Sequence, residues 1–276
     1  MIEEYVASES CPNELKEEFE FSKKEAKEYE EQEKEEHRVK AAELLVEGKV
    51  MEAANMGNPE AMGRMARMFC DGNGVDVDKS RCYLFARKAS NAGDMLGRFL
   101  LARCYHRGWG GVEVDWGKAL NLYMSCADEF PKEANHNMGN ICRIGAPTFV
   151  QDLLRAAGYY RLAANSGSAN SQFNLANQYY RGHGVERNLA EARKLYKMAA
   201  ELQYVNAIFY YGRMVMNGEG GERQKSAGVA LLRKAAAHGN KQATFDLAKR
   251  DGVVTKKYLS LKRKCLKAWS WAAVKK

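Results

Sequence analysis

The sequence predicts an all-α protein, a right-handed α/α solenoid of five to six helix-turn-helix repeats with a charged N-terminal helix and a basic C-terminal helix. Three observations lead to this prediction. The 276 residues include only four prolines. Good helix formers such as Ala, Leu, Lys and Glu are abundant. Glycines that close helical patterns recur with a nearly constant period, as in stacked hairpins that bury their apolar faces against one another.

The period is carried by four positions of each repeat. The glycines are spaced by 36, 37, 37 and 36 residues, and they are Gly72, Gly108, Gly145, Gly182 and Gly218. Six residues earlier stands a small residue, preceded by a large apolar one, and a third position follows at Phe69, Tyr105, Cys142, Tyr179 and Val215. The large residue and this third position share a helix face. The small residue lets a partner helix approach, and the glycine ends the helix at positive φ.

A second helix is expected after each of these turns. Each begins near an Asp, Asn or Lys, and most run into an Ala-rich last turn. The predicted ranges are Asp78–Asn91, Asp115–Asp128, Asp152–Asn165, Asn188–Glu201 and Lys225–Ala237. At the N-terminal end, Leu45–Met56 closed by Gly57 is interpreted as a lone second helix. The predicted organisation is an acidic arm at 1–44, a repeat solenoid at 45–252 and a basic capping helix or tail at 253–276.

These repeats resemble the Sel-one-like (SLR) repeats, which are relatives of tetratricopeptide repeats. The resemblance is clearest where LANQYYRGHGV at 175–185 is followed by LYKMAA at 195–200, and it spans roughly residues 45–250. The third repeat departs from the pattern, because Ala146-Pro147 replaces the usual Gly-x-Gly continuation, so we expect a reshaped turn there. The sixth places Asp251 at the aromatic position, as expected of an end cap.

The resemblance implies that the first helix of each pair lines a concave groove. Two rows of side chains would then face a ligand. The first row is Gly63, Phe99, His136, Phe173, Phe209 and Phe245, and the second is Arg67, Arg103, Asn140, Asn177, Arg213 and Lys249. In the functional interpretation the two asparagines hydrogen-bond the main chain of an extended peptide and the cations meet its carboxylates. In the alternative interpretation the phenylalanines are packing residues and the arginines form a solvated face.

Charge is divided unevenly along the chain. Residues 1–38 hold fourteen acidic and six basic residues, and residues 39–276 hold 21 acidic and 37 basic residues, giving −8 and +16. A basic body can attract acidic proteins, nucleic acid or anionic lipid.

The acidic arm, with an apolar stripe over 15–29, either docks on the basic stack and competes with ligands or stays solvated. The basic Trp-containing tail either binds RNA or a membrane surface or only caps the solenoid.

No motif in the sequence nominates catalysis or a cofactor. The Gly-x-Gly pairs follow helices and not strands, so they predict turns and not phosphate loops. The five histidines show no metal-ligand spacing, and no cofactor or metal is expected. Seven cysteines without a CxxC pair, together with the lack of a signal peptide or membrane span, predict a cytoplasmic or nuclear protein with reduced thiols.

The sequence therefore predicts a non-enzymatic adaptor or scaffold that binds other proteins, in particular acidic or extended segments. The alternative is an RNA-associated or membrane-peripheral assembly factor that acts through its C-terminal segment.

Overall fold

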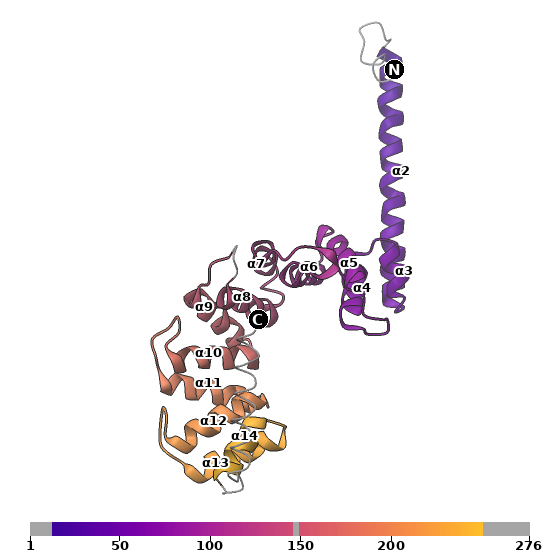
Figure 1. The fold of residues 1–276 in the computed structure, drawn as a ribbon. Helices are drawn as coiled ribbons and strands as arrows, with labels where there is room; N and C mark the ends of the chain where they lie inside the picture. Colours follow the sequence, from indigo (N-terminus) through magenta and orange to yellow (C-terminus); the bar gives the residue numbers. More distant parts are fainter. Residues whose placement is uncertain (1–12, 146–148, 251–276) are drawn as a thin grey trace, which may run out of the picture. The chain divides into compact units, whose positions relative to one another are not determined.

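Short helices joined by tight turns build the chain in this computed structural model, which describes residues 13–145 and 149–250 (Figure 1). The helices are α2 (Asn13–Val46), α3 (Val50–Asn55), α4 (Pro59–Asp71), α5 (Lys79–Asn91), α6 (Met95–Arg107), η1 (Trp109–Gly111), α7 (Trp116–Met124), α8 (Pro131–Ile144), α9 (Leu153–Asn165), α10 (Ala169–Arg181), α11 (Leu189–Glu201), α12 (Val205–Asn217), α13 (Lys225–Ala237) and α14 (Lys241–Arg250). No β-strand occurs in these residues. The predicted α/α solenoid class is confirmed.

Contacts divide the chain into two compact units, residues 1–122 (unit 1) and 123–276 (unit 2). In unit 1, α4 packs against α5, α5 against α6, and α4 also reaches α6. In unit 2, α8, α10 and α12 each pair with the helix that follows, and each second helix also contacts the next first helix or, for α13, α14. Within each unit, the neighbouring hairpins named here therefore pack on one another, which is the packing expected of repeats that cannot bury their apolar side alone.

One backbone hydrogen bond recurs at every hairpin turn. The N–H of the residue before the second helix donates to the carbonyl of the third repeat position identified in the sequence. The five bonds run from Asp78 to Phe69, Asp115 to Tyr105, Asp152 to Cys142, Asn188 to Tyr179 and Gln224 to Val215, at 2.8–3.0 Å between N and O. Four first helices end at a glycine in the left-handed region, as the sequence predicts.

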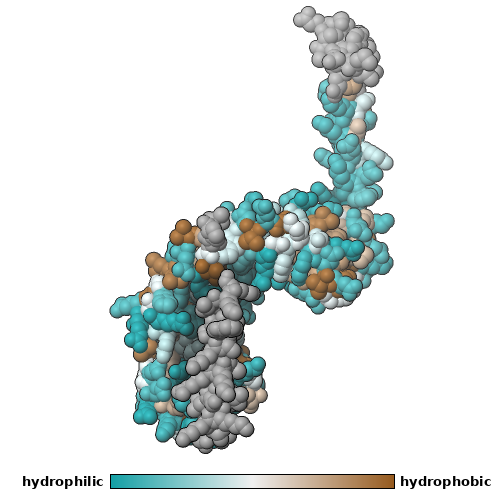
Figure 2. Space-filling model, viewed as in Figure 1, coloured by the Kyte–Doolittle hydropathy of each residue, from teal (hydrophilic) through white to brown (hydrophobic). Residues whose placement is uncertain are grey.

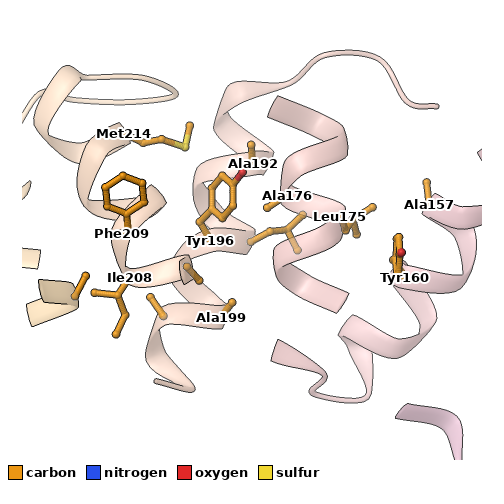
Figure 3. Packing of buried hydrophobic residues seen from close by; sticks show 14 of the residues in the cluster. Ala157, Tyr160, Leu175, Ala176, Ala192, Tyr196, Ala199, Ile208, Phe209 and Met214 are labelled. Atoms are coloured by element: carbon orange, nitrogen blue, oxygen red, sulfur yellow. The ribbon is translucent and has the colours of Figure 1, made fainter. Parts of the chain in front are cut away.

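Tyrosines of the second helices form the centre of the core. Tyr123, Tyr160 and Tyr196 are each 0% exposed and each stands eight residues after the residue that precedes its helix. In unit 2, Tyr160 and Tyr196 lie among small alanines and larger Leu175 and Ile208 (Figure 3). The alanines let helices approach and the tyrosines fill the space between them, which gives the dense packing that protein interiors require.

Two predicted helices have different bounds in the structure. Residues 45–56 are not one helix, because Gly48 adopts a φ of 81° and its N–H bonds to the Leu45 carbonyl, which closes α2 at Val46 before α3 starts. The second predicted helix ends at Met124 and not at Asp128. After Met124 the chain forms turns in which the N–H of Cys126 and of Ala127 each donate to the carbonyl three residues earlier. Pro131 keeps Phe130 out of the helical region.

The third repeat turns differently from the others, as predicted. Gly145 has a φ of 68° but a ψ of 162°, whereas the glycines that end α4, α6, α10 and α12 have ψ between 21° and 33°. The chain therefore leaves α8 in another direction. Residues 146–148 lie outside the described part of the chain.

The described part of the predicted acidic arm, from residue 13 on, lies in the single helix α2, and residues 20–40 of this helix are exposed. The helix contacts α3, and its surface is hydrophilic over most of its length (Figure 2). Lys24–Glu28 and Lys34–Glu30 are ion pairs between residues four apart, which support an isolated helix. Of the predicted apolar stripe, Tyr29 is 70% exposed, Ser22 and Ala26 are also exposed, and Phe19 is half-buried.

Candidate functional site

The predicted aromatic row belongs largely to the core. Phe99 is 5% exposed and Phe209 is 3% exposed, so both rings are buried in this structure, in keeping with the alternative interpretation that these phenylalanines are packing residues. Phe173 is half-buried and its ring packs on Tyr196 and Tyr204 at centroid distances of 5.7 and 5.2 Å. Phe245 is also half-buried.

The two asparagines of the second row are bound within the protein. The Tyr160 hydroxyl donates to Asn140 Oδ1 at 2.7 Å, and the Tyr196 hydroxyl donates to Asn177 Oδ1 at 2.8 Å. Asn177 Nδ2 in turn donates to the Phe173 carbonyl at 3.0 Å. A buried tyrosine hydroxyl needs such a partner. These amides therefore hold first and second helices together, and their carbonyl oxygens are already engaged.

His136 extends this network from α8 to α10. Asn140 Nδ2 must donate to His136 Nε2, 3.0 Å away, because the other side of that amide accepts from Tyr160. The imidazole proton is then on Nδ1 and is donated to Ser171 Oγ at 2.8 Å. Burial lowers the pKa of His136 below its ordinary 6.5, and the nearby Arg143 guanidinium lowers it further. The neutral imidazole is a structural link between two repeats.

This link predicts a loss of stability in acid. Since the pKa of His136 is lower when folded than when unfolded, the unfolded chain binds more protons below about pH 6.5 and stability falls with pH there. Protonation also places an N–H against the Asn140 amide. The urea midpoint of the wild type should drop more steeply than that of His136→Gln between neutral pH and about pH 5. The His136→Gln variant removes only the contribution of His136 to the pH dependence of stability, because the other titratable groups, such as His106 and the carboxylates, are unchanged. Identical pH dependence in the two proteins would contradict the assignment.

The cationic members of the second row remain accessible. Arg67 on α4, Arg213 on α12 and Lys249 on α14 are exposed, and the Arg103 side chain on α6 is 26% exposed. The Arg213 guanidinium lies over the Phe209 ring, with its Cζ 5.7 Å from the centroid. The core phenylalanine thus supports an exposed cation. Of the two predicted rows, the cations are the part that can meet a ligand.

A basic hollow of about 770 Å³ lies at the start of α13 in unit 2. It is lined by Arg223, Gln224, Lys225, Ser226, Ala227, Val229, Arg233 and Arg250. None of the predicted groove residues borders it. Its charge agrees with the basic character of the repeat region.

The structure gathers one cluster that the sequence analysis missed. Trp109 follows the glycine that ends α6, and Lys79, Arg103 and Arg107 surround its ring. Only Arg103 belongs to the predicted rows. The sequence did contain a sign of this cluster, because the residue after the glycine is polar in other repeats, namely Asn73, His183 and Glu219. A tryptophan there stands out once the repeats are compared position by position.

The structure describes five of the seven cysteines and none of the predicted tail. Cys70, Cys82, Cys104, Cys126 and Cys142 are buried, as expected of small core residues. The tail at 253–276, Cys11 and Cys265 lie outside the described residues. Within 13–145 and 149–250 no cluster of three or more His, Cys, Asp and Glu side chains could hold a metal ion. The described helices include none that is long and apolar enough to span a bilayer.

Comparison with protein families gives five matches along the chain. The model described as Sel1 repeat matches residues 59–94, 96–123, 132–168, 169–204 and 205–240, which together make up more than half of the sequence. Each match begins within one residue of the start of a first helix, and the second match ends one residue before the end of α7. The register is therefore the one that the glycine period defines.

Curated relatives match over part of the chain only. A chitin synthase regulatory factor 3 from Schizosaccharomyces pombe is 31% identical over 133 residues, which are 47% of this chain and 14% of the relative. A DAP3-binding cell death enhancer 1 from Rattus norvegicus is 35% identical over 85 residues, 31% of this chain and 16% of the relative. The chain thus spans about a seventh of the length of these relatives.

Two solved structures share the fold. One is c5321, a protective antigen of uropathogenic Escherichia coli with an SLR fold, at a TM-score of 0.65 and 28% identity over 72% of this chain and 42% of that one. The other is a Sel1 repeat protein from Oxalobacter formigenes, at a TM-score of 0.64 and 24% identity over 83% of this chain and 99% of that one. Stacked helical hairpins are common to all three.

Proposed function

Since this chain belongs to the Sel1 repeat family, which generally serves in protein–protein interaction, we propose that it is a non-enzymatic scaffold whose exposed first-helix cations, in each of the two units, bind acidic, extended segments of partner proteins. The observation that carries the proposal is the accessibility of Arg67 and Arg213 at equivalent positions, where Asn140 and Asn177 are internally bonded. The excess of basic residues over 39–276 supports the same choice of partner.

The chemistry of the row favours carboxylates. A guanidinium presents several N–H donors in a plane that fits a carboxylate with two hydrogen bonds. Arg213 rests on an aromatic face, which restricts the side chain and lowers the entropy lost on binding.

Charge reversal tests the proposal directly. The double variant Arg67→Glu/Arg213→Glu should bind a fluorescein-labelled Glu-rich peptide at least about tenfold more weakly than the wild type, because two attractive pairs become repulsive. Fluorescence anisotropy at low and physiological ionic strength measures the affinity. Binding should also weaken as salt rises.

Lys88→Glu/Lys197→Glu is the matched control, since both lysines are exposed on second helices and the net charge changes equally. This control should lose much less affinity than the first-helix variant. Equal losses in the two double variants would show that only overall charge matters and would refute the assignment to the row.

A further inference from the structure

Three cationic side chains of unit 1 surround the ring of Trp109. Lys79 Nζ lies 4.1 Å from the ring centroid, and the Cζ atoms of Arg103 and Arg107 lie 5.0 and 5.4 Å from it. Lys79 opens α5, and the two arginines are one turn apart on α6. An indole attracts cations at these distances through its electron-rich face. The ring therefore keeps together three like charges, which we name the Trp109 cluster.

The segment that carries Trp109 is fixed against α5. η1 contacts both α5 and α6. Gly110 has a φ of 78°, and a Cβ added there would collide with Tyr83 Cβ and lie 3.0 Å from the Lys79 carbonyl oxygen. Only glycine allows this approach. The Lys79 ammonium is itself held by a hydrogen bond to the Cys70 carbonyl at 2.5 Å. The cations are thus placed before any ligand arrives.

The cluster carries more positive than negative charge. Asp71 Oδ1 lies 3.9 Å from Arg103 Nη1. Among residues 13–145 and 149–250, it is the one carboxylate within ion-pair distance of the three cations. Three cations and one carboxylate leave an excess of two positive charges. The Lys79 ammonium uses one of its three N–H groups within the protein. Arg107 is exposed, and Lys79 and Trp109 are half-buried, so the cluster is open to solvent.

We propose that the Trp109 cluster binds a phosphorylated serine or threonine of a partner protein. Such a side chain carries about −1.5 to −2 charges at neutral pH and three strong acceptor oxygens, which match an excess of two positive charges. A Glu or Asp side chain neutralises only one of them. Arginine is also the side chain that best fits phosphate with paired hydrogen bonds. This inference rests on the proposed scaffold function and names the chemistry that unit 1 selects.

The test compares three degenerate peptide libraries on the full chain. All carry fluorescein and random flanks, and the fixed central residue is phosphoserine, glutamate or serine. The phosphoserine library should bind at least about tenfold more tightly than the glutamate library, and the serine library more weakly still. Equal affinity for the phosphoserine and glutamate libraries would overturn the proposal. So would tighter binding of a single-stranded RNA probe, because the site would then serve nucleic acid.

Variants assign the binding to this cluster. Arg107→Gln leaves the core untouched and should reduce the preference for phosphoserine over glutamate to about threefold or less. Trp109→Phe keeps a ring with a weaker cation attraction and should have an intermediate effect. Arg81→Gln is the control, because Arg81 lies on α5, as Lys79 does, but its guanidinium is over the Phe69 ring of α4 and pairs with Asp78. Retained preference in the Arg107→Gln and Trp109→Phe proteins would refute the assignment.

The outcomes separate this inference from the scaffold function. If the phosphoserine preference is absent while Arg67→Glu/Arg213→Glu still weakens binding of the Glu-rich peptide, only the phosphate site is wrong. If neither the Glu-rich peptide nor any library binds, the scaffold function fails as well. Because Arg107 and Trp109 lie outside the predicted first-helix row, the two sets of variants report on different residues.

Discussion

Replacing Tyr196 with alanine is expected to destabilise the α10–α12 region of unit 2 by about 3–5 kcal/mol. The side chain is 0% exposed and its ring stacks on Tyr210 with a centroid distance of 5.5 Å and an interplanar angle of 13°. It also touches Phe173, so its removal leaves a cavity between two hairpins. Native-state hydrogen exchange of the α10–α12 amides measures this loss, because it reports the opening of individual repeats.

Two matched variants divide the effect into parts. Tyr196→Phe keeps the ring but deprives Asn177 Oδ1 of its donor, which should cost about 1–3 kcal/mol. Tyr29→Ala removes a tyrosine that is 70% exposed on α2 and should change stability by less than about 0.5 kcal/mol. If Tyr196→Phe were as damaging as Tyr196→Ala, packing of the ring would not be the main contribution.

A methyl group at Gly220 should cost about 3 kcal/mol in unit 2. Gly220 has a φ of 70°, and a Cβ built on it would collide with the carbonyl oxygen of Leu189, the first residue of α11. The loop after α12 therefore rests directly on the preceding hairpin. Gly220→Ala must both strain its own backbone and push the loop away. A lower urea midpoint and faster exchange at the start of α11 are the expected readouts.

Gly239→Ala is the control for the backbone contribution alone. Gly239 has a φ of 85° but no atom within 4 Å of its added Cβ. It should cost only about 1 kcal/mol, the strain of the left-handed conformation. The difference between the two variants measures the contact between repeats. Equal costs would mean that the Gly220 loop moves away freely and that this contact contributes no stability.

The repeat architecture could be predicted because it is written in local patterns. The glycine period, the capping residues and the small residues at fixed offsets each depend on neighbours within one hairpin. Four of the five predicted second helices have the predicted C-terminal ends, and their starts differ by one residue at most. The exception is α7, which ends at Met124 ahead of Phe130, the residue that Pro131 keeps out of the helical region.

The candidate site was predictable only in part. A position at a fixed offset from the glycine can point to the core or to solvent, since the helix face changes within two residues. Phe99 and Phe209 thus turned out to be core residues, whereas Arg67 and Arg213 are exposed. Asn140 and Asn177 were placed correctly on the first helices, but their partners lie 20 and 19 residues away on second helices. No local pattern reveals such a bond.

The sequence by itself determined that this protein is a stack of helical hairpins, where most of the hairpins begin and end, and that it belongs among SLR proteins. Those features follow from interactions along one or two helical turns. Only the tertiary structure decided which tyrosine meets which asparagine, which phenylalanines are buried, and that Lys79, Arg103 and Arg107 converge on Trp109. These depend on how neighbouring helices pack, and packing distance and angle follow from the volumes of side chains that are distant in sequence.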